Sequence, residues 1–258
     1  MKYRGFGGLR ALACALGLLA SGCPNPNIYG SPRTLPAGKV SHTIAVEGVG
    51  YHFTRRDAYV EQEGLPRTAS AATLVPPSYS LRVGIADRFD FGFRAANMSS
   101  LGVDIKGNFL RSEVLDLALD PFVQWSFLGG VDTTHVHLPL LVGFNASPKI
   151  TVLLTPGMMY GVSSFKYAND ADLSELKQLM GTNGFYARLG LGLDARLSKK
   201  FAIHPEITVL KALNPPTDSV FESTLMYTFG FGFVLGAQPD YSDLAGAAPP
   251  AASPAPAQ

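Results

Sequence analysis

The segment FESTLMYTFGFGFVLG, residues 221–236, alternates between two kinds of residue along its whole length. One set is large and apolar: Phe221, Leu225, Tyr227, Phe229, Phe231, Phe233 and Leu235. The other set contains Glu222, Thr224, Met226, Thr228, Gly230, Gly232 and Val234. A period of two places the two sets on opposite faces of a β-strand. Strands of soluble proteins average about 5–6 residues, whereas a strand that crosses a bilayer needs about 9–11. The segment is therefore typical of a membrane-crossing strand.

Alternating segments of this kind account for most of the chain. Their approximate bounds are 41–54, 71–86, 88–97, 101–110, 113–128, 134–146, 148–165, 184–198, 200–212 and 221–236. Consecutive alternating segments joined by turns predict an all-β, antiparallel fold. We expect about ten strands within residues 41–236.

The connections between these segments alternate between short and long. Short turns are predicted at Asp87-Arg88, Arg111-Ser112, Ser147 and Ser198-Lys199. Longer links span about residues 55–70, 129–133, 166–183 and 213–220, with a shorter one near 97–100. Barrels of the outer membrane have short periplasmic turns and longer outer loops. An even number of strands also returns both ends of the barrel to the periplasmic side.

The chemistry of the two faces predicts which one contacts lipid. Large apolar side chains share one face of successive segments, for example Trp125, Phe127, Val136 and Leu138. In a soluble barrel all of these would have to fit into a lumen that is small at this strand number. We therefore expect the apolar face to contact lipid. The alternative is a soluble lipocalin-like barrel or sandwich on a lipid tether.

The opposite face carries the charges, which we expect to face the lumen. They are Arg82, Asp90, Arg94, Asp104, Lys106, Asp116, Asp120, Arg188, Asp194, Arg196, Glu206 and Glu222. Selective channels usually show a bias of one sign at a constriction, and this set is nearly balanced. Barrels of about eight strands are already filled by their own side chains. The set therefore predicts an internal salt-bridge network, with a narrow pore as the alternative.

Residues 41–236 resemble small outer-membrane β-barrel proteins in this pattern of segments and connections. The resemblance implies a transmembrane antiparallel β-barrel in the cell outer membrane, in contact with its lipids. Such families commonly end on an aromatic residue that marks the last strand for assembly, but this chain continues past Phe233. Four prolines lie within predicted strands and each removes a ladder donor, so bulges or breaks are expected. They are Pro121, Pro139, Pro156 and Pro205.

Residues 1–22 have the features of an export signal. A basic start with Lys2, Arg4 and Arg10 precedes the apolar run Ala11–Ala20, which is about half the length of a spanning helix. The sequence Leu19-Ala20-Ser21-Gly22-Cys23 resembles the lipobox of bacterial lipoproteins. The resemblance implies that Cys23 is lipidated, becomes the mature N-terminus and anchors the chain from the periplasmic side. An ordinary secretory signal cut nearby is the alternative.

The cysteine content agrees with lipidation. The chain has two cysteines, and Cys14 lies inside the signal, so Cys23 would remain alone in an exported protein. No disulfide is then possible in the mature chain. Residues 23–40 are rich in Pro, Asn and Gly and predict a lipidated N-terminal tether.

Two further segments lie outside the predicted sheet. Residues 169–181 predict a short helix in the longest outer loop, with Leu173, Leu176 and Met180 on one face as candidate partner contacts. Residues 237–258 are rich in Pro and Ala and predict a disordered periplasmic tail. We expect these two segments to contact protein partners in the cell envelope.

The motif DTTHVH holds the main candidates for chemistry. His135 and His137 share one strand face, and Asp132 is predicted in the adjacent loop. Two histidines and a carboxylate can bind a metal or form a base with its orienting group. The competing interpretation is that both histidines hydrogen-bond within a polar lumen. Because no nucleophile or second ligand cluster accompanies them, we expect no catalysis, no metal and no cofactor.

These expectations lead to a non-catalytic function. A net charge of +1, with only 16% charged residues, gives no reason to expect nucleic acid as a partner. We expect an outer-membrane barrel lipoprotein that acts as a structural or anchoring subunit of a motility, secretion or export machine. The alternatives are a narrow pore and a rim enzyme that acts on lipid or peptide.

Overall fold

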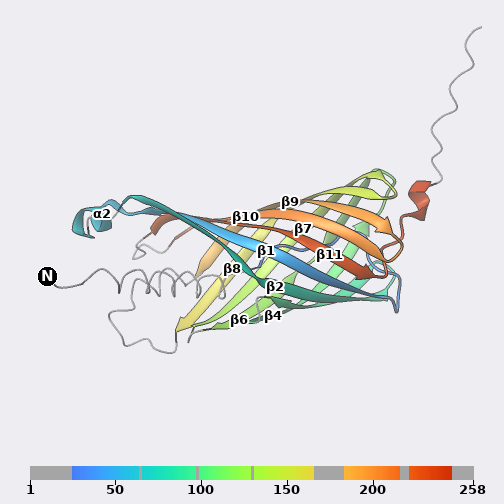
Figure 1. The fold of residues 1–258 in the computed structure, drawn as a ribbon, viewed down its shortest axis with the longest axis horizontal. Helices are drawn as coiled ribbons and strands as arrows, with labels where there is room; N and C mark the ends of the chain where they lie inside the picture. Colours follow the sequence, from blue (N-terminus) through green and yellow to red (C-terminus); the bar gives the residue numbers. More distant parts are fainter. Residues whose placement is uncertain are drawn as a thin grey trace, which may run out of the picture.

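The computed structural model describes residues 25–63, 66–96, 99–128, 131–165, 183–215 and 221–245. These residues form a closed antiparallel barrel whose successive strands lie side by side (Figure 1). The first strand, β1, pairs with the last strand, β11, over the length of both and closes the ring. The predicted all-β, antiparallel barrel is confirmed.

The strands are longer than those of most soluble sheets. They are β1 (Val40–Arg55), β2 (Thr68–Ala86), β3 (Phe89–Ala96), β4 (Ser100–Leu110), β5 (Leu115–Leu119), β6 (Phe122–Leu128), β7 (Val131–Ser147), β8 (Ile150–Phe165), β9 (Gly184–Ser198), β10 (Phe201–Ala212) and β11 (Phe221–Gly236). Several exceed the length that a tilted strand needs to cross a bilayer.

The short strands β5 and β6 share one position in the ring. Both pair with β4 on one side and with β7 on the other. The break between them falls at Asp120 and Pro121, because proline has no N–H for the ladder. The Pro121 carbonyl still accepts a hydrogen bond from the Ile105 amide at 3.2 Å. The single strand predicted over 113–128 is therefore two, and the ring has ten strand positions.

The two ends of the barrel differ in their connections. At the end that we call the short-turn end, two-residue turns join β2 to β3, β7 to β8 and β9 to β10. The other end, the loop end, carries the 56–67 connection with helix α2 (Asp57–Glu63). The link after β6 is shorter than predicted, because β7 already begins at Val131. Figure 1 shows α2 at the opposite end of the barrel from the C-terminal turn η2 (Ser242–Ala245).

The outer surface of the barrel is apolar. Large side chains are exposed on it in every part of the ring, including Val46, Phe91, Phe93, Ile105, Trp125, Leu138, Leu189, Leu191, Ile207, Phe229 and Phe231. Exposing this many apolar side chains to water is unfavourable in free energy, whereas contact with lipid is favourable. None of the described helices is long and apolar enough to cross a bilayer.

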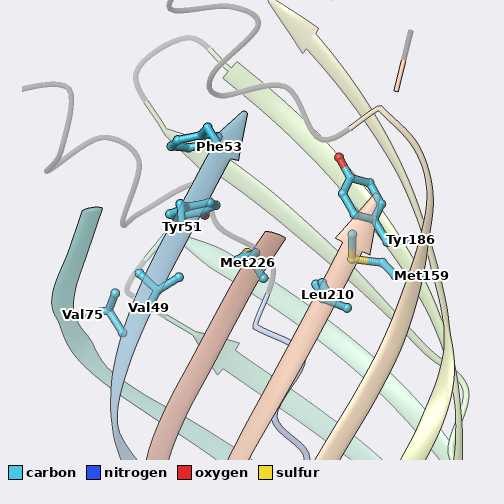
Figure 2. Close-up of a cluster of buried hydrophobic side chains, with 8 residues drawn as sticks. All are labelled: Val49, Tyr51, Phe53, Val75, Met159, Tyr186, Leu210 and Met226. Carbon is cyan, nitrogen blue, oxygen red and sulfur yellow. The ribbon is translucent and has the colours of Figure 1, made fainter. Parts of the chain in front are cut away.

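On one side of the ring, the inner surface changes from polar to apolar along the barrel. Charged and polar side chains line it from the short-turn end to its middle. In the loop-end half, an arc of the wall on β2, β1, β11, β10, β9 and β8 carries buried apolar side chains (Figure 2). We call this arc the apolar luminal wall; its residues are Val49, Tyr51, Phe53, Val75, Met159, Tyr186, Leu210 and Met226.

Candidate functional site

The polar half of the lumen is occupied by the protein's own chain. Residues 25–39, which we call the luminal segment, precede β1 and run inside the barrel to the short-turn end. Their buried side chains are Asn27, Ile28, Tyr29, Ser31, Arg33, Thr34 and Leu35. A lipidated N-terminal tether was predicted for residues 23–40, and the structure places residues 26–35 of this range inside the barrel. The physical reason is that charged side chains on the inner face of the barrel form hydrogen bonds with this segment.

Carboxylates of the wall accept hydrogen bonds from main-chain amides of the luminal segment. Glu206 Oε2 accepts from the amides of Ile28 and Tyr29 at 3.0 and 2.9 Å. Asp90 Oδ1 accepts from the Leu35 amide at 2.9 Å. Because a buried N–H without a partner is costly, these carboxylates make it possible for an irregular segment to lie inside the barrel.

Cations of the wall complete the arrangement by donating to main-chain carbonyls of the luminal segment. The pairs are Arg188 to Pro26 at 2.7 Å, Arg94 to Asn27 at 3.0 Å, and Lys106 to Ser31 and Arg33, both at 2.9 Å. Hydrogen bonds to charged groups are the stronger kind, at about 1.5–3 kcal/mol each. The luminal charges therefore bind a polypeptide backbone.

The same charges also pair with one another. Arg82 Nη2 lies 2.6 Å from Asp104 and 3.2 Å from Asp120. Arg94 lies 2.9 Å from Asp104, and Lys106 lies 3.0 Å from Asp90. These groups come from β2, β3, β4 and the β5–β6 break, which are adjacent in the ring, so the pairing of neighbouring strands brings them together. This part of the predicted salt-bridge network is present.

Tyr29 is held where the barrel wall has no side chains. A Cβ built on Gly230 would lie 2.2 Å from the Tyr29 hydroxyl, and one on Gly232 would lie 2.8 Å from its ring. The hydroxyl donates to Glu47 at 2.7 Å on the neighbouring strand β1. The alternating glycines of β11 therefore make room for the luminal segment.

The short-turn end is closed by residues that follow β11. The Tyr241 ring lies between the guanidinium groups of Arg33 and Arg196, whose central carbons are 4.3 and 3.6 Å from its centroid. Arg33 also contacts Asp116 at 2.7 Å and Asp243 at 2.5 Å. We call residues 237–245 the C-terminal latch. A disordered tail was predicted from residue 237, and the structure corrects this for the latch, because two arginines bury Tyr241.

Charges at the latch shift the acid–base behaviour of its residues. The hydrogen bond from Arg33 holds the pKa of Asp243 below its ordinary value. Burial raises the pKa of the Tyr241 hydroxyl to about 12. At neutral pH the latch therefore presents a carboxylate to Arg33 and a neutral phenol between two cations.

The structure places the predicted luminal charges as follows. Asp90, Asp104, Lys106, Asp116, Asp120, Arg188, Asp194, Arg196 and Glu206 are buried inside the barrel. Arg82 and Arg94 are largely buried, with side-chain exposures of 15% and 13%. Glu222 is different: its side chain is 54% exposed and lies 3.6 Å from Arg67. It stands at the loop-end start of β11, beyond the enclosed lumen.

The candidate catalytic residues do not form one site. His135 and His137 are buried on the inner face of β7, and His137 stacks on Phe122 with ring centroids 3.9 Å apart. Asp132 lies within β7 rather than in a loop, and the strand's alternation places it on the opposite face. Among the described residues no group of three or more His, Cys, Asp or Glu is arranged to hold a metal ion.

Other predicted features lie outside the described residues. These are Cys23, the 169–181 helix with Leu173, Leu176 and Met180, and the end of the chain from residue 246. Sequence reasoning missed the luminal segment and the latch. The one available signal was the number of charges on the inner face, because Glu206 and Asp90 accept hydrogen bonds from this segment.

These features define a membrane-spanning β-barrel of the outer-membrane type, with an apolar outer surface and a lumen whose polar half is occupied by its own chain. No protein-family model and no curated protein sequence matches the chain.

Solved structures with a similar barrel are known. Ail, the attachment invasion locus protein of Yersinia pestis, is 11% identical and the match covers 77% of this chain and 99% of Ail, with a TM-score of 0.31. The outer-membrane protein OprG of Pseudomonas aeruginosa is 15% identical over 82% of this chain and 100% of OprG, with a TM-score of 0.35. The outer-membrane protease OmpT of Escherichia coli is 7% identical over 80% of this chain and 98% of OmpT, with a TM-score of 0.39.

Proposed function

We propose that the protein is a non-catalytic structural or anchoring subunit of an envelope-spanning assembly of the motility, secretion or export type. The observation that carries the proposal is the occupied lumen. Luminal charges that a channel would present to a solute are bonded here to the backbone of residues 26–35. A barrel organised in this way serves as a rigid body in the membrane rather than as a conduit.

The position of the C-terminal end supports the same proposal. The latch places Ala245, the last described residue, at the short-turn end, which in outer-membrane barrels faces the periplasm. Residues 246–258 follow it and are composed largely of Pro and Ala. Segments of this composition suit contacts with partners at a distance from the barrel. We propose that this end of the chain reaches a periplasmic partner, and that Cys23 carries a lipid.

The alternatives have less support. A narrow pore requires the luminal segment to leave the lumen, against its bonds to charges on several strands. A rim enzyme would use His135 and His137 with Asp132, but Asp132 belongs to the opposite face of β7. We therefore keep the scaffold as the proposal.

The test is purification of the tagged, full-length protein from outer membranes in mild detergent, followed by mass spectrometry of the proteins that accompany it. We expect envelope proteins in stoichiometric amounts. A matched variant that lacks residues 246–258 should lose the periplasmic partners while its barrel still migrates as a folded species in unheated gels. If the wild type is purified alone and conducts steadily in a planar bilayer, the scaffold is wrong and the pore is correct.

A further inference from the structure

The apolar luminal wall is unusual for the inside of a membrane barrel. Lumens of such barrels are normally polar, with the apolar residues directed outward. Here six neighbouring strands carry apolar side chains on their inner face in the loop-end half (Figure 2). The wall includes two aromatic rings on β1, Tyr51 and Phe53, stacked with centroids 5.6 Å apart. A continuous inner surface of this kind is suited to an apolar occupant.

The described chain begins at the edge of this wall. The Asn25 amide donates to Gln124 at 3.0 Å, and its side-chain nitrogen donates to Glu47 at 2.7 Å. Glu47 is the inward-facing residue that precedes Val49 on β1, and Val49 is the first member of the wall on that strand. From Asn25 the luminal segment runs toward the short-turn end. Whatever precedes Asn25 therefore starts beside the apolar wall.

Chain length limits where Cys23 can be. Cys23 lies two positions before Asn25, and an extended chain advances at most about 3.6 Å per residue, so the α-carbons of the two residues are at most about 7 Å apart. Glu47, which holds Asn25, is seven residues along β1 from Val40 at the short-turn end. At about 3.3 Å per residue this is roughly 23 Å of strand. While the luminal segment is seated, the Cys23 sulfur is out of reach of lipid at the short-turn end.

We propose that acyl chains carried by Cys23 lie inside the barrel against the apolar luminal wall. This inference rests on the lipidation of Cys23 proposed above. It gives the wall an occupant attached two positions before Asn25, which is bonded to Glu47 at the edge of the wall, and it removes the acyl chains from water. The lipid then completes the filling of the lumen, with the luminal segment below it and the latch at the short-turn end.

The experiment uses cells supplied with a diazirine-containing palmitate analogue. The full-length protein is purified, its lipid is detected by intact mass, and the sample is irradiated before residue-level mapping of cross-links. We expect cross-links at inward positions such as Met159, Leu210 and Met226. Outward neighbours such as Met158 and Phe229 should carry several-fold fewer. Cys23→Ala should give none.

Matched substitutions on β8 provide the control. Met159→Gln places an amide on the apolar wall, and Met158→Gln places the same amide on the exposed outer face. We expect the first to reduce luminal cross-links several-fold and the second to leave them unchanged. Cross-links only to phospholipid or to outward residues would overturn the luminal position with lipidation intact. The absence of any lipid mass would overturn lipidation itself, and neither result bears on co-purified partners.

Discussion

Glu206 belongs both to the barrel wall and to the segment inside it. It lies on β10, is buried, and accepts hydrogen bonds from two consecutive amides of the luminal segment. Its other oxygen lies 3.6 Å from Arg188, which itself donates to the Pro26 carbonyl at 2.7 Å. One ion pair thus satisfies three main-chain groups of the segment, and loss of either partner leaves buried polar groups unpaired.

We predict that Glu206→Ala loosens the luminal segment. Each buried amide left without an acceptor costs roughly 1–3 kcal/mol. Hydrogen exchange at the Ile28 and Tyr29 amides should therefore accelerate about tenfold or more, as measured by mass spectrometry of the purified protein. The control is Glu222→Ala, which removes an exposed carboxylate on β11. Unchanged exchange at Ile28 and Tyr29 in Glu206→Ala would contradict the assignment.

The latch should respond to acid through Asp243. Arg33 depresses the pKa of this carboxyl in the folded state. A depressed folded pKa contributes stability that is present above the ordinary pKa of aspartic acid and is lost as pH falls through the folded pKa. We therefore expect the latch to be docked at neutral pH and released in strong acid. Because the Asp243 side chain is half exposed, the change should be small.

A spin label on Ala245→Cys, in a background without Cys14 and Cys23, measures this release. Its paramagnetic resonance spectrum should be immobilised at neutral pH and become slightly more mobile as pH falls through the depressed pKa of the Asp243 carboxyl. With Asp243→Asn added, the label should show this slightly higher mobility at neutral pH and no further change in acid. If the spectrum of the labelled protein that retains Asp243 does not change with pH, Arg33 does not hold the latch through this residue.

Among the elements, the luminal segment determines whether the lumen is blocked. It contributes the Ile28 side chain to a small apolar cluster with Ala118 and Leu141 on the wall. Tyr29 occupies the space above Gly230 and Gly232. The sequence predicts the strands on either side, because their alternation is local. It does not predict this segment, whose peptide groups and side chains, such as those of Tyr29 and Arg33, meet partners on strands that are distant in sequence.

Removal of the luminal segment should open the barrel. We expect deletion of residues 25–35 to produce discrete, steady conductance steps in a planar bilayer, where the wild type shows none. The reason is that the deletion leaves the luminal charges to water and ions. Deletion of residues 246–258 serves as the control and should leave the barrel closed. Equal conductance of the wild type and the 25–35 deletion would show that the segment does not obstruct the lumen.

For the whole molecule, the apolar outer surface implies a defined position in the bilayer. Leu191 lies in the middle of β9 and Leu197 next to its short turn, and both are exposed, at 54% and 59%. An arginine on the lipid face costs about 2–4 kcal/mol at the bilayer midplane and about 0–1 near the interface. Leu191→Arg should therefore destabilise folding in vesicles by that larger amount, and Leu197→Arg by little. The measurement is equilibrium refolding in urea with lipid vesicles, and equal losses would contradict the predicted depth.

The sequence by itself determined that the chain forms a barrel and which face of each strand is directed toward lipid. Alternation such as that of residues 221–236 is a local property of the chain, and lipid accepts only the apolar face. It also predicted the break region through Pro121 and the inward charges. The tertiary structure alone decided what those charges do. Glu206, Arg188 and Lys106 bind peptide groups, which every residue carries. The side-chain pattern of residues 25–39 therefore does not predict these hydrogen bonds. Only closure of the ring brings these charges around one volume, and only there do peptide groups of an irregular segment, such as those of Ile28, Tyr29 and Leu35, find buried partners.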